Sequence, residues 1–242
     1  MKRTALYVLI TYIVMQLSGL IAGPLLYVMF YSMGVERADA ELLASGWWIF
    51  VSMLLAVIVF VIFSVVDKKF FDVFKGKRAP VWKILLWGIV GFFMVLVGQM
   101  LAGVIEQELF GVDPGSENTM GLLEIAKAAP VAIFAIALFA PILEEIIFRR
   151  VIFASILKKT NFFLAGAVSA IVFAVIHFDF THILLYAVSG FIFAFLYYRT
   201  KSIFTSMIAH MLLNTFVVVV NLNQDKIQQF VEYLKNLQNM SS

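Results

Sequence analysis

The sequence predicts an all-α fold: a polytopic transmembrane helical bundle with about seven spans. Hydrophobic residues make up 63% of the 242 positions and charged residues only 14%. Several apolar runs also exceed the ~20 residues that a helix needs to cross a bilayer. We therefore expect a single integral membrane domain over residues 1–242, with no room for a separate soluble domain. The absence of cysteine excludes disulfides, thiolate zinc sites and a cysteine nucleophile.

The expected spans follow the apolar runs in chain order. The first is too long for the core of a signal peptide, so we interpret it as an uncleaved span. Pro141 interrupts the fourth span, where its missing donor favours a local opening of the helix. After the last span, apolar residues at helical spacing predict a short amphipathic tail over 222–242, at the membrane interface or packed on the bundle. The seven spans cover residues 5–31, 46–66, 84–105, 131–157, 162–180, 183–198 and 203–221.

The connections between the spans alternate in charge, which predicts the orientation of the chain. Basic residues gather around residues 67–83, 158–159 and 199–201, whereas acidic residues dominate 36–41 and 106–124. The positive-inside rule places the basic connections and the amino terminus in the cytoplasm. The carboxyl terminus is then outside, in a multi-pass protein of the bacterial cell membrane. Because the basic residues are distributed over several short connections rather than concentrated on one face, nothing indicates nucleic-acid binding.

Two adjacent carboxylates, Glu144 and Glu145, lie inside the apolar run of the fourth span. A charge at the centre of a membrane costs roughly 2.5–3.5 kcal/mol on insertion scales, and such residues are usually functional. Glu145 and Arg149 are four residues apart and share a helix face, where they can form an ion pair. Glu144 is turned about 100° from Glu145 by the 3.6-residue period, which leaves it available for another partner.

Three further polar residues occur at a matching depth on later spans. His177 lies on the fifth span, and His210 and Asn214 share one face of the seventh span. At 1.5 Å per residue, these residues and Glu144 lie roughly 14–24 Å from the cytoplasmic ends of their spans. A carboxylate and an imidazole can activate water, while a second imidazole and an amide stabilise a developing oxyanion. The set predicts a water-activating hydrolase site.

Three motifs make a family resemblance specific: EEIIFR at 144–149, FAVIH at 173–177 and HMLLN at 210–214. The patterns EExxxR, FxxxH and HxxxN, in this order on successive late helices, resemble those of the CPBP family (CAAX protease and bacteriocin-processing, also called Abi). Members of this family are intramembrane endopeptidases related to the type II CAAX prenyl protease. The resemblance covers roughly residues 140–215, within a motif-bearing core of about 131–221.

This resemblance implies a function and a role for each motif residue. The protein would hydrolyse a peptide bond in a membrane-associated protein or peptide, such as a CAAX-type, bacteriocin or signal-peptide-like substrate. The first glutamate of EExxxR and the histidine of FxxxH would activate the water, and HxxxN would form the oxyanion site. The second glutamate and the arginine would organise the site. The implied catalytic residues are Glu144, Glu145, Arg149, His177, His210 and Asn214.

The question of a metal stays open at this point. Glu144, His177 and His210 are candidate ligands for zinc. However, an HExxH motif is absent, and the resemblance also allows a metal-free, glutamate-based mechanism. Outside the motifs, we expect His182 on the loop side at the interface and Asp179 as a cap or a solvated charge.

Two other classes of function are compatible with polar residues in a membrane. A proton-coupled transporter also uses membrane carboxylates and histidines, but we find no internal repeat of the kind typical of transporters. A non-catalytic membrane protein for immunity or regulation could keep the fold and lose the chemistry, although the intact motif set argues against this loss. The expected partners are the lipid bilayer and a membrane-associated peptide or protein substrate.

Overall fold

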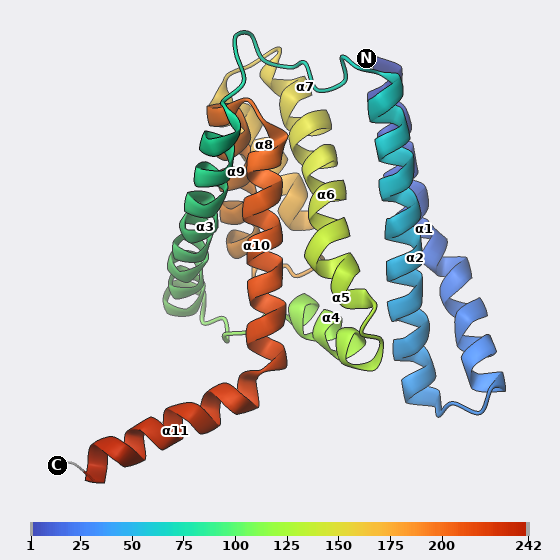
Figure 1. Ribbon diagram of the computed structural model, residues 1–242, viewed down its shortest axis with the longest axis vertical. Helices are drawn as coiled ribbons and strands as arrows, with labels where there is room; N and C mark the ends of the chain where they lie inside the picture. Colours follow the sequence, from blue (N-terminus) through green and yellow to red (C-terminus); the bar gives the residue numbers. More distant parts are fainter. Residues whose placement is uncertain (1, 241–242) are drawn as a thin grey trace.

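The computed structural model describes residues 2–240, and every regular element among them is a helix (Figure 1). The first four helices are α1 Lys2–Ser32, α2 Arg37–Val66, α3 Val81–Phe110 and α4 Glu117–Ala128. A composite helix follows, with the segments α5 Ala132–Phe134, η1 Ala135–Phe139, α6 Ala140–Glu144, η2 Glu145–Phe153 and α7 Ala154–Leu157. The last four helices are α8 Phe162–Val175, α9 Ile183–Thr200, α10 Ile203–Leu222 and α11 Gln224–Met240.

In the part of the chain that the structure describes, five helices are long and apolar enough to cross a membrane: α1, α2, α3, α9 and α10. The composite helix and the shorter apolar helix α8 bring the total to about seven. The predicted all-α membrane bundle is therefore confirmed. Several helices differ from the predicted spans at their ends, among them α3, which continues to Phe110 rather than 105. Helix α2 begins at Arg37 rather than at residue 46, because the polar residues before Gly46 are also helical, and α8 ends at Val175 rather than at residue 180.

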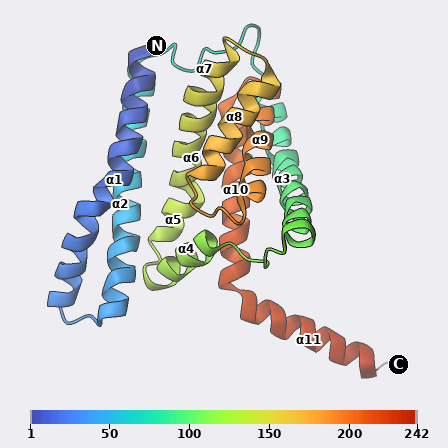
Figure 2. The ribbon, with the colours of Figure 1, turned by 180° about the vertical axis from the view of Figure 1, so that it is seen from behind.

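The helices form two groups with the composite helix between them (Figures 1 and 2). Helix α1 packs along α2 at one edge of the molecule, and α3, α8, α9 and α10 pack together at the other. The composite helix contacts α2, α8 and α10. The short helix α4 packs against the part of α2 that lies near the beginning of α2. Helix α11 extends away from the bundle with its apolar side chains exposed, so its place at the membrane interface stays a prediction.

Glycines on α3 allow this helix to approach α9 and α10 closely. A Cβ atom at Gly91 would lie 2.3 Å from Leu196 Cδ1, and one at Gly88 would lie 2.7 Å from Ile208 Cγ2. Small residues are typical of helix contacts in membrane proteins, because close packing, rather than exclusion of water, drives helices together in lipid. This contact holds α10, and with it the HxxxN motif, in a fixed position within the bundle.

The composite helix contains two π-helical segments that the sequence patterns do not predict. In η1, the Ala140 N–H donates to Ala135 O, five residues back. Pro141 has no N–H with which to continue this register to Ile136 O. The second segment, η2, begins at Glu145. Wide turns of this kind occur frequently at functional sites, and here Glu144 lies between the two segments and Glu145 begins the second.

Arg150, which lies outside the motifs, connects η2 with the loop between α2 and α3. Its Nε donates to Phe70 O, and its guanidinium lies 4.3 Å from the centre of the Phe70 ring. Phe70 is fully buried by this contact and its neighbours. Arg150 therefore attaches the loop between α2 and α3 to the composite helix.

Candidate active site

Side chains from all three motifs meet at one cavity of about 520 Å³ inside the bundle. Glu144 reaches the cavity from the composite helix, and His210 and Asn214 reach it from α10. His177 also lines the cavity, but from the turn beyond α8 rather than from the fifth span as predicted, because α8 ends two residues earlier. The structure thus brings together residues from three separate segments, as the depth comparison suggested.

Glu145 lies behind the wall of this cavity and forms the predicted ion pair. Its Oε2 lies 3.2 Å from Arg149 Nε, and neither side chain has exposed surface. Its Oε1 accepts a hydrogen bond of 3.1 Å from His210 Nδ1. The Arg149 guanidinium is further enclosed by aromatic rings, at 4.7 Å from the centre of Phe173 and 5.3 Å from that of Phe193. Glu145 and Arg149 therefore form a buried support that orients the imidazole of His210.

Glu144 has a different environment from its neighbour. Its side chain keeps 14% of its surface exposed, toward the cavity. The nearest basic nitrogen is His210 Nε2, at 3.6 Å from Oε2, which is beyond hydrogen-bonding distance. The expected division of the two glutamates is therefore present in the structure: one carboxylate is engaged in a buried pair, and the other faces the open space.

The tautomer of His177 follows from its hydrogen bond. Nδ1 lies 2.7 Å from Phe173 O, and a carbonyl oxygen can only accept, so Nδ1 carries the proton. In the neutral imidazole, Nε2 is then the acceptor. The ring stacks on Tyr186, with centroids 4.1 Å apart and planes inclined by 27°. His177 therefore presents one lone pair in a restrained ring beside the cavity.

Asn214 satisfies the carbonyl that the π-helical register leaves without a backbone donor. Its Nδ2 donates to Ile136 O over 2.9 Å. Pro141 is the residue that would otherwise supply this donor in η1. Since the amide carries two N–H groups, one of them remains for a ligand in the cavity.

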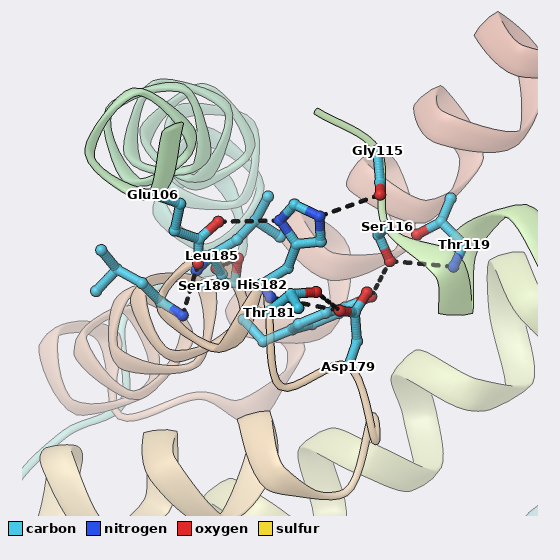
Figure 3. A network of polar contacts seen from close by, with 11 residues as sticks. Glu106, Gly115, Ser116, Thr119, Asp179, Thr181, His182, Leu185 and Ser189 are labelled. Carbon is cyan, nitrogen blue, oxygen red and sulfur yellow. Dashed lines mark hydrogen bonds and ion pairs between the residues drawn. The ribbon is translucent and has the colours of Figure 1, made fainter. Parts of the chain in front are cut away.

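A second polar network lies beside the cavity, between the end of α3 and the start of α9 (Figure 3). His182 donates from Nδ1 to Glu106 Oε2 and from Nε2 to Gly115 O, each over 3.0 Å. Glu106 Oε1 accepts from the backbone N–H groups of Leu184 and Leu185, and so caps the amino end of α9. Because both ring nitrogens face acceptors, the network favours the doubly protonated imidazole.

The network involves two residues of the turn before α9, His182 and Asp179. His182 lies on the loop side, as expected, but it is only 6% exposed, because Glu106 and Gly115 enclose it. Burial opposes its protonation, but the hydrogen bond to Glu106 and the charges of Asp179 and Glu106 outweigh it and raise the pKa of His182. Asp179 is not a solvated charge, since it is 6% exposed and its Oδ1 accepts from the His182 N–H and from Thr181 Oγ1 within the turn before α9.

Sequence reasoning did not single out Glu106 or Tyr186. Glu106 directly follows an apolar run, where a carboxylate is typical of a solvated connection, and no motif marks Tyr186. The available signal was the position of His182, nine residues past the start of FAVIH and four before Tyr186. Only the packing of α3 against α9 shows that these residues meet.

The residues of the cavity do not fit a zinc site. Within residues 2–240, no three His, Asp or Glu side chains come together closely enough to hold a metal ion. Catalytic zinc sites use three protein ligands. The candidates Glu144, His177 and His210 do not form such a set, so we derive no step through a metal.

Comparison with known proteins gives consistent matches. The family model "Type II CAAX prenyl endopeptidase Rce1-like" matches residues 126–216. The putative membrane peptidase YdiL of Bacillus subtilis (strain 168) is 42% identical over 223 residues, which cover 92% of this chain and 91% of YdiL. The membrane-embedded CAAX protease MroQ of Staphylococcus aureus (strain USA300) is 36% identical over 151 residues, 60% of this chain and 61% of MroQ. No solved structure matches the chain.

Proposed function

The chain belongs to the Rce1-like family of type II CAAX prenyl endopeptidases, and from this premise we propose that it cleaves peptide bonds with water activated by Glu144 and His177. Its family and its apolar helices make it an integral membrane protein and a protease. The proposed substrate is a membrane-associated protein or peptide, of CAAX type or resembling a bacteriocin or signal peptide. The proposed setting is the bacterial cell membrane, with the amino terminus in the cytoplasm and the carboxyl terminus outside.

The proposed reaction begins with a water molecule between Glu144 and His177. The Glu144 carboxylate takes a proton from this water, and His177 Nε2 accepts its second hydrogen bond. The resulting hydroxide attacks the scissile carbonyl carbon. Glu144 then returns the proton to the leaving amine, so that one carboxyl group serves as base and as acid. The exposed face of Glu144 supports this role, since its carboxylate is not engaged in the buried pair.

The proposed oxyanion site lies on α10. Asn214 offers its second N–H, and His210 can donate through Nε2 when its imidazole is doubly protonated. The hydrogen bond from His210 Nδ1 to Glu145 Oε1 fixes the ring so that Nε2 faces Glu144 and the cavity. Donors that are fixed before the reaction stabilise charge that appears only in the transition state. The observation that carries the proposal is the common cavity shared by Glu144, His177, His210 and Asn214.

The test compares Glu144→Gln with the matched exposed control Glu108→Gln. Cells that carry only Glu144→Gln should accumulate an uncleaved membrane peptide, which mass spectrometry of protein termini identifies against wild-type cells. The purified Glu144→Gln protein should fold but not cleave this peptide in liposomes, because glutamine is nearly isosteric but cannot accept the proton. The control should cleave at the wild-type rate. Wild-type turnover by Glu144→Gln would refute the catalytic assignment. A peptide that binds without being cleaved by the wild type would favour the non-catalytic alternative.

A further inference from the structure

Tyr186, at the start of α9, stacks on the ring of His177. The two rings stack with centroids 4.1 Å apart, and Tyr186 is only 8% exposed. His177 lies in a turn, and the following residue Phe178 has a positive φ of 54°. The helical backbone therefore does not fix the ring of His177. Its orientation depends on the Phe173 carbonyl, on the Phe173 ring, which packs edge-on with centroids 4.6 Å apart, and on the face of Tyr186.

The hydroxyl of Tyr186 contacts a different part of the chain. It lies 2.8 Å from Ser116 Oγ and accepts a hydrogen bond of 3.2 Å from Asn118 Nδ2. Both partners are at the amino end of α4, where Ser116 caps the helix by accepting from the Thr119 N–H. Residues of α4 line the cavity together with His177. Tyr186 thus connects one wall of the cavity to the histidine beside it.

The segment before α4 is held from a second side. Gly115 O accepts from His182 Nε2, and Figure 3 also draws a polar contact between Ser116 and Asp179. His182 in turn is fixed by Glu106 at the end of α3. Because the amino end of α4 is anchored in this way, the hydroxyl of Tyr186 has a stationary partner, and its ring has little freedom to tilt.

We propose that Tyr186 is a positioning residue for the reaction, with separate roles for its ring and its hydroxyl. The ring keeps Nε2 of His177 directed at the water that Glu144 activates, and the hydroxyl holds the amino end of α4 against the cavity. This inference rests on the proposed function, because it assigns a consequence to the orientation of His177. A displacement of about 1 Å at a reacting group can cost 10²-fold in rate.

The experiment separates the two roles with Tyr186→Leu and Tyr186→Phe. The probe is the peptide that accumulates in Glu144→Gln cells, cleaved in liposomes by protein whose folded fraction is measured. Tyr186→Leu should lower kcat by about 10- to 100-fold with little change in KM, because the ring is lost. Tyr186→Phe keeps the ring and should retain kcat within about 3-fold, while amide hydrogen exchange at residues 116–120 becomes about 2- to 10-fold faster.

Tyr7 supplies the matched control, since its ring stacks on Phe63 at 5.6 Å and does not line the cavity. Tyr7→Leu and Tyr7→Phe should leave both kcat and the exchange of α4 unchanged. Wild-type kcat in Tyr186→Leu, or an equal loss of kcat in the Leu and Phe variants, would overturn the role of the ring. Unchanged exchange in Tyr186→Phe would overturn the role of the hydroxyl. If Glu144→Gln is inactive while Tyr186→Leu is fully active, only this inference fails and the proposed function stands.

Discussion

Replacing Glu145 by alanine should destabilise the protein much more than replacing its neighbour Glu144. Glu145 is fully buried, with one carboxylate oxygen 3.2 Å from Arg149 Nε and the other 3.1 Å from His210 Nδ1. Arg149 is equally buried, and its nitrogens make no hydrogen bond to any residue that the structure describes. The Glu145→Ala variant therefore leaves a buried guanidinium without its ion-pair partner, with Glu144 as a weaker and more distant counter-charge.

The expected magnitude follows from this burial. Removing one partner of a buried ion pair costs ~3–5 kcal/mol in the free energy of unfolding. The aromatic rings around Arg149 do not reduce this cost, because they make the same contacts in the wild type. Glu144 is partly exposed and makes no contact shorter than 3.6 Å to a basic group, so its loss should cost at most about 1 kcal/mol.

Thermal unfolding of the purified variants in one detergent measures the difference. At about 2–4 °C per kcal/mol for a protein of this size, the melting temperature of Glu145→Ala should fall roughly 6–20 °C. The double variant Glu145→Ala/Arg149→Met should recover much of this loss, since no charge is then stranded. Equal melting temperatures for Glu144→Ala and Glu145→Ala, or a double variant no more stable than Glu145→Ala, would refute the reasoning.

Three further predictions concern the amide of Asn214, the dependence of activity on zinc, and the network of His182 and Glu106. Asn214→Ala should lower kcat by about 10²–10³-fold with little change in KM. Asn214→Asp should lower kcat at least as much, because it places a carboxylate beside the oxyanion that develops in the transition state. A defect in KM alone, measured by steady-state kinetics, would make Asn214 a binding residue. Chelators should leave turnover intact, and elemental analysis should find far less than one equivalent of zinc; activity lost on chelation and restored by zinc would contradict this. The raised pKa of His182 means that its pairing with Glu106 stabilises the fold fully below about pH 6.5 and is lost as the pH rises through the higher folded value. The gap in melting temperature between wild type and His182→Gln should therefore narrow from pH 6 to pH 9, and a constant gap would count against the charged pair.

The sequence predicted the architecture well because lipid imposes a simple rule. A spanning segment must be apolar and helical along its whole length, so apolar runs locate the spans. The first predicted span, 5–31, corresponds to Lys2–Ser32, and the last, 203–221, to Ile203–Leu222. The rule fails where helices continue into polar sequence, as at Arg37, and where an apolar run continues past the helix, as after Val175.

Contacts between buried polar side chains were predictable only where the two residues are close in sequence. The pair of Glu145 and Arg149 follows from a spacing of four residues, and the structure contains it. The contact of Glu106 with His182 joins positions 76 residues apart, so no local period indicates it. From its position in the sequence, Glu106 belongs to the acidic connection that follows α3, although it is 3% exposed and caps another helix. Burial of a charge at a helix end depends on the neighbouring helix, which hydropathy does not specify.

The bond between Asn214 and Ile136 joins the structural and the chemical roles of α10. An unpaired carbonyl in the membrane interior is costly, and the π register together with Pro141 creates one at Ile136. Asn214 pairs with it over 2.9 Å from a position 78 residues away. Because that bond fixes the plane of the amide, it also sets the direction of the second N–H, which is the preorganisation that an oxyanion donor requires. Replacing Asn214 therefore affects both catalysis and folding. The two effects can be separated only when kcat and the free energy of unfolding are measured on the same variant.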